Sequence, residues 1–214
     1  MSSPISVLAE VKELLKRAAA FSSLSLFYSV LALIGPRETH PPFSIGTTFG
    51  IEEFTAHFLF GVIAAIPAMD WRLAAYCGIF AVAIDLDHLP VTLGLQVVGR
   101  PAHSFTIMAV AGILMGLAFR SRGRFDRLLM LTTFAAVLSH ISYDLYEASR
   151  LDFPLLLPLY SEQFTLGREA WLPFQLAAMG FSALTHFGRR GQFQKAFLSI
   201  LPGVRRWRPR NEPT

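Results

Sequence analysis

Residues 128–144 read LLMLTTFAAVLSHISYD, an uninterrupted apolar run that ends in a histidine and an aspartate. Within lipid, a run of this kind can form all of its backbone hydrogen bonds only as a helix or in a closed barrel. No alternating pattern typical of a barrel is present. His140 and Asp144 are four residues apart, so a helix presents both side chains on one face. The segment is therefore expected to be a membrane helix with an imidazole and a carboxylate near one end.

The rest of the chain has the same organisation. Apolar stretches can be marked at residues 18–35, 54–68, 73–84, 103–119, 128–143 and 171–187. His57 lies at the start of the second, Asp-Leu-Asp-His at 85–88 follows the third, and His103 opens the fourth. Hydrophobic residues make up 53% of the 214 residues and charged residues only 16%, whereas soluble domains carry about a quarter charged residues. We predict an all-α, polytopic membrane bundle of about six transmembrane helices.

Basic residues are concentrated in alternate connections between these stretches. They are Lys12, Lys16, Arg17, Arg120, Arg122, Arg124, Arg127, Arg189, Arg190, Lys195, Arg205, Arg206, Arg208 and Arg210. The positive-inside rule then predicts that the N-terminus, the loop around residues 120–127 and the C-terminal tail are cytoplasmic. Because successive spans are antiparallel, all the histidine and aspartate clusters fall on the extracytoplasmic side. The net charge of +4 is thus interpreted as a topology signal, and no nucleic-acid partner is predicted.

Three parts of the chain are distinguished. Residues 1–53 comprise a cytoplasmic segment, the first span and an external loop; residues 54–187 form the membrane domain with the polar clusters; and residues 188–214 form a basic tail at the cytoplasmic leaflet. Cys77 is the only cysteine, which excludes an intramolecular disulfide and a cysteine-based zinc cluster. It is expected to be a small core residue.

The polar clusters together contain seven candidate metal ligands. They are His57, Asp85, Asp87, His88, His103, His140 and Asp144. Mixed imidazole and carboxylate donors suit Zn²⁺, with Mn²⁺ or Fe²⁺ as alternatives. One zinc takes only three or four protein ligands, so one or two ions are expected, and two sharing a carboxylate would use the donors better. A lone interfacial histidine is usually only a snorkelling group, but agreement of all clusters in depth and side favours a metal site.

Neighbouring polar residues are candidates for other roles. Glu53 shares a helix face with His57 and is a further ligand or the general base. Arg100 either clamps a phosphate or anchors the chain at lipid headgroups, and Ser104 either caps a helix or orients a ligand. Glu53 and Arg100 join Asp87 and His103 as predicted catalytic residues. By contrast, His40 and His186 are predicted to be non-ligands.

The motifs resemble a known family. They are Ala56-His57 with Gly61, Asp85-Leu86-Asp87-His88, Arg100-Pro101-Ala102-His103-Ser104, Ser139-His140 with Asp144, and Leu156-Leu157-Pro158. In order and spacing they are similar to those of the YdjM-like family of inner-membrane metal-dependent hydrolases, over about residues 54–187. The chain departs from that pattern at Ile84, where the family prefers proline, and at Val98 and Gly99, where it has a His-Arg pair. The resemblance implies a metal-dependent hydrolase of a prokaryotic inner membrane and no particular substrate.

The predicted position of the polar clusters at the membrane surface limits the class of substrate that we expect. A site at headgroup depth meets amphiphilic substrates, so we predict hydrolysis of an ester or phosphoester, such as a phosphodiester, in a membrane lipid. The first alternative is a divalent-metal transport or sensing protein, because intramembrane carboxylates and imidazoles also mark ion pathways. A transport path needs polar residues that continue towards the cytoplasm, and the inner halves of the spans hold almost none beyond serine and threonine. The second alternative is a scaffold held together by a structural metal.

Overall fold

A computed structural model describes residues 4–31, 50–93, 100–121, 123–148, 150–160 and 162–189. Its helices are α1 (Pro4–Leu31), α3 (Ile51–Ala65), α4 (Trp71–Ile84), α5 (Leu89–Thr92), α6 (Phe105–Ala118), α7 (Arg127–Glu147) and α8 (Trp171–Arg189). Short 3-10 turns are η2 (Ile66–Ala68), η3 (Asp85–His88), η4 (Pro101–His103) and η5 (Arg168–Ala170). Each predicted apolar stretch lies largely within a helix, so the all-α prediction is confirmed. His40, Val98, Gly99, most of the loop at 35–50 and the tail from residue 190 lie outside the described residues.

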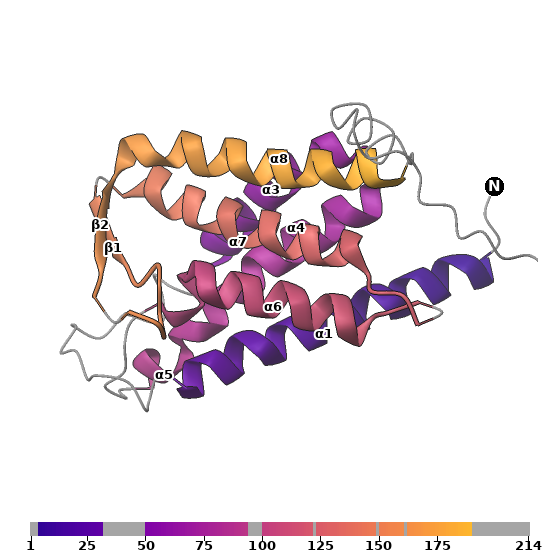
Figure 1. Cartoon of the computed structure of the whole chain (residues 1–214), viewed down its shortest axis with the longest axis horizontal. Helices are drawn as coiled ribbons and strands as arrows, with labels where there is room; N and C mark the ends of the chain where they lie inside the picture. Colours follow the sequence, from indigo (N-terminus) through magenta and orange to yellow (C-terminus); the bar gives the residue numbers. More distant parts are fainter. Residues whose placement is uncertain are drawn as a thin grey trace, which may run out of the picture.

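The long helices pack side by side along one direction (Figure 1). Helix α7 is central and contacts α3, α4, α6 and α8. Small residues such as Ala135, Ala136 and Ser139 on its buried faces allow neighbouring backbones to approach closely. In Figure 1 the start of α1 and the connection from α6 to α7 lie at one end of the bundle. Helix α5 and the strands β1 (Arg150–Phe153) and β2 (Phe164–Gly167) lie at the other end.

Two described helical segments, Ile51–Ala68 and Arg127–Glu147, are long and apolar enough to cross a bilayer. Helices α4 and α6 have 14 residues each, which is short of the ~20 that an untilted span needs. Length and composition thus support membrane association through these two segments. The six-span topology and its orientation remain predictions.

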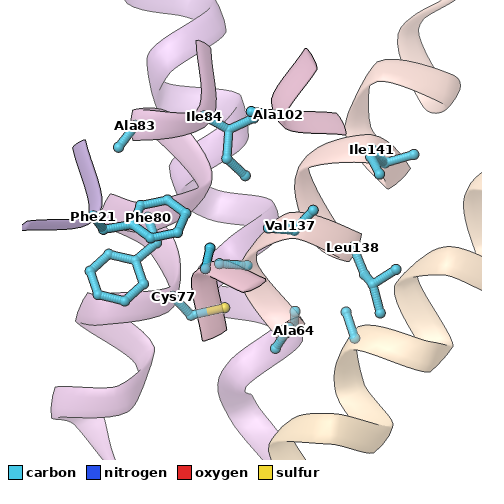
Figure 2. Close-up of a cluster of buried hydrophobic side chains, with 14 of the residues drawn as sticks. Phe21, Ala64, Cys77, Phe80, Ala83, Ile84, Ala102, Val137, Leu138 and Ile141 are labelled. Atoms are coloured by element: carbon cyan, nitrogen blue, oxygen red, sulfur yellow. The ribbon is translucent and has the colours of Figure 1, made fainter. Parts of the chain in front are cut away.

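Helix α1 begins well before the first predicted apolar stretch, so the expected cytoplasmic segment and first span form one continuous helix. The aromatic rings of Phe21 in α1 and Phe80 in α4 stack with their centroids 4.6 Å apart. In the last turn of α1, the Ser29 hydroxyl lies 3.4 Å from the Leu86 carbonyl oxygen. Figure 2 shows Phe21 and Phe80 in the same apolar cluster as Cys77, which is fully buried, as predicted. Helix α1 therefore packs directly on the elements that carry the polar clusters.

Helices α3 and α4 form a tight hairpin. The carboxylate of Asp70 accepts hydrogen bonds from the backbone N–H groups of Arg72 (2.8 Å) and Leu73 (3.3 Å), which caps the start of α4. Gly61 of α3 faces α4 so closely that an added Cβ would lie 2.7 Å from the carbonyl oxygen of Cys77. The glycine at position 61 is therefore required by the close approach of two helix backbones.

Replacing Gly61 by alanine is expected to lower the free energy of unfolding by about 1–3 kcal/mol, because the added methyl group meets backbone atoms that cannot rotate away. Thermal unfolding of the purified protein measures this change. Gly180→Ala in α8 is the matched control, since its Cβ would meet nothing within 4 Å. The control should be neutral or stabilising by up to about 1 kcal/mol. Equal effects of both substitutions would contradict the close packing at Gly61.

Candidate metal centre

Four separate segments bring all seven predicted ligands together at one end of the bundle. The segments are the first turns of α3, the turn η3, the turn η4 and the last turns of α7. Helices α3 and α6 begin at this end, while α4 and α7 finish there, which is the arrangement expected for antiparallel neighbours. Figure 2 labels Ile84, Ala102 and Ile141, each next in sequence to a candidate ligand, within the apolar core that borders the cluster.

The donor atoms form three overlapping groups, each with donors within 4.8 Å of one another. The groups are His57–His140–Asp144, Asp85–His103–His140 and Asp87–His88–His103. His103 and His140 each belong to two groups, and their Nε2 atoms are 2.8 Å apart. These buried clusters could hold a metal ion.

Charge at this site is concentrated and hidden from solvent. Within the described residues, every buried Asp, Glu, His, Lys or Arg is one of these seven, and Asp87, His103 and His140 are 0% exposed. Three carboxylates converge here, and the guanidinium of Arg100 pairs with one of them, that of Asp144. Carboxylates that are buried together disfavour each other's ionised form, and a bound divalent cation would compensate their charge.

The backbone fixes the orientation of His140. Its Nδ1 lies 2.7 Å from the carbonyl oxygen of Ala81, which can only accept, so Nδ1 carries the proton and donates it. The lone pair of Nε2 is then directed at the cluster, 3.5 Å from Asp85 Oδ1. The rings of His57 and His140 stack with their centroids 3.8 Å apart, which positions His57 as well. Such an outer hydrogen bond is typical of metal-ligating histidines.

His103 lies between two carboxylates. Its Nδ1 is 3.3 Å from Asp87 Oδ2, and its Nε2 is 3.1 Å from Asp144 Oδ2. Asp87 Oδ2 also accepts a hydrogen bond of 2.7 Å from the backbone N–H of Ala102. Burial alone would raise the pKa of Asp87, but His88, His103 and the Ala102 N–H together hold it below its usual range. Asp87 is therefore ionised and available as a ligand.

Asp85 has a different environment. Burial raises its pKa well above the usual range, and the nearby Asp144 carboxylate raises it further. Its Oδ1 is 3.6 Å from His88 Nε2, and its Oδ2 is 3.5 Å from His57 Nε2. Among the described side chains, buried Asp85 Oδ2 and Asp87 Oδ1 have no hydrogen-bond partner. Buried acceptors normally have partners, and a coordinated cation would supply one here.

Arg100 and Glu53 are the other two predicted catalytic residues, and both lie near the cluster. Arg100 is in the left-handed conformation (φ 57°), which is rare for a residue with a side chain. Its guanidinium pairs with Asp144 Oδ2 and lies 5.5 Å from the ring centroid of Phe153. Glu53 Oε2 is 3.9 Å from His57 Nε2, and its side chain is 22% exposed. Arg100 therefore faces the cluster, while Glu53 borders it.

Some supporting groups were not predicted from the sequence. Phe153, in β1, is 0% exposed, and its ring stacks on that of His103 with a centroid separation of 5.8 Å. The hydroxyl of Ser104 lies 3.0 Å from the carbonyl oxygen of Leu155 and 2.6 Å from that of Leu157. Leu157 belongs to the segment that carries part of the family resemblance, so a motif signal existed, whereas Phe153 had none. His186, in the last turn of α8, lies away from the cluster, as predicted.

Ser104 caps α6, as one of its two predicted roles required, by accepting a hydrogen bond from the backbone N–H of Thr106. Ser104→Ala removes this cap and the link to the segment at 155–157, and should destabilise the fold by about 1–3 kcal/mol. Thermal unfolding again measures the effect. Ser23→Ala is the control, because its exposed hydroxyl bonds only to its own helix at Ala19. A stability loss no larger than that of the control would contradict this role.

Comparison of the chain with protein-family models, with curated proteins and with solved structures finds no match.

Proposed function

We propose that this chain is a membrane-embedded, metal-dependent hydrolase that cleaves an ester or phosphoester bond, most simply in a lipid. The observation that carries the proposal is the convergence of seven buried imidazole and carboxylate groups from four separate segments. The resemblance of its motifs to those of the YdjM-like family supports the same reaction class. Zinc is the proposed metal, with manganese or iron as alternatives, and one or two ions fit the donor set.

Different side chains of the cluster would have different roles in such a reaction. A divalent cation, when bound, lowers the pKa of water to give a nucleophile and polarises the oxygen of the ester or phosphoryl group. His103 and His140 connect the donor groups, and Asp87 contributes an ionised carboxylate held by Ala102. Glu53, at the partly exposed edge, is placed to accept a proton from an incoming water. Arg100 supplies a fixed positive charge towards the developing negative charge of the transition state.

The proposed setting is the extracytoplasmic face of a prokaryotic inner membrane, with about six spans and both termini in the cytoplasm. Two helical segments that can cross a bilayer support the membrane location. The basic connection between α6 and α7 lies at the end of the bundle opposite the cluster. That separation agrees with a cytoplasmic basic end and an external polar cluster.

The transport alternative is disfavoured by the scarcity of buried ionisable side chains beyond the cluster, among the described residues. Along α7 towards the basic end, the buried polar side chains are the hydroxyls of Thr132 and Thr133, which donate to carbonyl oxygens of the same helix. Within the described part of the chain, no buried carboxylate or imidazole continues from the cluster towards the basic end.

Metal analysis combined with a hydrolysis assay tests the proposal. Purified protein should contain divalent metal and should release headgroup or phosphate from mixed membrane lipids, whereas Asp87→Ala should lose both properties. Asp152→Ala is the matched control, because Asp152 is an exposed carboxylate in β1 that pairs with Thr165. Full metal content with no turnover of any ester, in wild type and control alike, would favour a transport, sensing or structural site.

A further inference from the structure

An apolar groove leads directly to the metal cluster. It has a volume of about 490 Å³ and lies between α1, α3 and α4. Phe54 and Phe58 form its α3 wall, while Ile79 and Val82 of α4 and Leu86 of η3 form the facing wall. These side chains recur at helical spacing along facing sides of the two helices. The groove is therefore a continuous channel along the α3–α4 hairpin.

Among the described residues that line the groove, Asp85 alone carries a carboxylate. This carboxylate belongs to the metal cluster, with Oδ1 3.5 Å from His140 Nε2 and Oδ2 3.5 Å from His57 Nε2. An apolar cavity that opens onto a cluster of polar ligands matches a molecule with an apolar chain and a polar head. The groove and the cluster thus form two parts of one amphiphilic site.

We propose that this groove binds one acyl chain of the lipid whose ester or phosphoester bond is cleaved, a proposal that rests on the proposed hydrolase function. The helical stretch from Ile79 in α4 to Leu86 in η3 spans about 10 Å, which accommodates part of a single chain. Each buried methylene contributes about 0.8 kcal/mol, so the groove would hold the chain and place the bond to be cleaved beside Asp85. A purely polar substrate would gain nothing from these walls.

The position of the groove gives a lipid chain access to it. Helix α3 forms one wall and belongs to the segment Ile51–Ala68, which is long and apolar enough to cross a bilayer. Phe58 lines the groove and is 37% exposed, and Thr55, also in the wall, is exposed. A chain can therefore enter from the side of the bundle, without passing through the polar cluster.

Photolabelling tests the groove independently of hydrolysis. The probe is a long-chain lysophospholipid with a diazirine at mid-chain, added at low mole fraction to the intact protein in detergent, with and without excess unlabelled lysophospholipid. Saturable labelling is expected on the peptides containing Phe58 and Val82. Ile79→Trp fills the groove and should reduce this labelling at least about tenfold, which corresponds to lost contact with about two methylene groups. Thr55→Trp, on the opposite and more exposed wall, is a second blocking variant.

Leu117→Trp is the matched control, because Leu117 is 49% exposed on α6 and does not line the groove. Metal content, measured on every variant, shows whether the cluster is intact. Labelling that is not saturable, or that is equal in blocked and control variants with full metal content, would overturn the groove assignment even if the protein hydrolyses lipids. Saturable, blockable labelling in a protein with metal but no turnover would uphold the groove and refute the hydrolase.

Discussion

Replacing His103 by alanine is expected to lower the affinity for divalent metal by more than about a hundredfold, the largest effect that the structure predicts. His103 belongs to two of the three donor groups, so its loss leaves both incomplete. It also separates Asp87 from Asp144, lying 3.3 Å and 3.1 Å from their respective carboxylate oxygens. Without the imidazole, two carboxylates remain buried with less compensation. Metal content after dialysis against a graded series of chelator concentrations measures the change.

His186→Ala is the control for this experiment. His186 lies in the last turn of α8, at the other end of the bundle from the cluster. This variant should retain metal as the wild type does. If His103→Ala folds and retains full metal content, the ion is bound elsewhere and the assignment of the cluster is wrong.

Replacing Arg100 by glutamine is expected to lower kcat/KM for an anionic ester about 10²–10³-fold, the range observed when one oxyanion-stabilising donor is removed. The side chain is 17% exposed and paired with Asp144, so its charge is partly desolvated and acts strongly on nearby groups. Its backbone, held in the left-handed conformation, is a feature more typical of functional sites than of ordinary loops. Steady-state kinetics on a phosphodiester lipid, together with metal analysis, measures the effect.

Two further variants and the metal content show why Arg100→Gln loses activity. Arg168→Gln removes an exposed guanidinium that lies over Tyr146, and it should leave kcat/KM unchanged. Arg100→Lys keeps the charge but not the planar fork of donors, and should recover only part of the rate. If Arg100→Gln loses metal in proportion to activity, the arginine positions Asp144 and has no direct role with the substrate.

The helices and their polar ends could be predicted because both leave strong signals in the sequence. Long apolar runs indicate helices, and His140 and Asp144 lie on one face by spacing alone. Antiparallel succession then brings the ends of the helices together. This simple rule was sufficient to place His57 and His103 beside the Asp85–His88 turn, although these segments are far apart in the chain.

Other features depend on contacts that a sequence pattern does not encode. The β1–β2 hairpin replaces part of a predicted loop, because its four-residue strands are too short for a recognisable alternation. Phe153, which stacks on His103, belongs to that hairpin and looks like an ordinary loop aromatic in the sequence. Helix α1 extends to Pro4 because helices do not require an apolar run once charged side chains face outward. The apolar groove forms only because apolar side chains of α3 and α4 face each other in the folded chain.

Anomalous diffraction from crystals of the purified protein, recorded above and below the absorption edge of its bound metal, locates the ion among the side chains. Our prediction is an anomalous peak inside the cluster. It should lie about 2.0–2.2 Å from imidazole nitrogens of His103 or His140 and from a carboxylate oxygen of Asp85, Asp87 or Asp144. A metal-replete protein with no anomalous peak among these residues, or with its peak elsewhere on the chain, would contradict it.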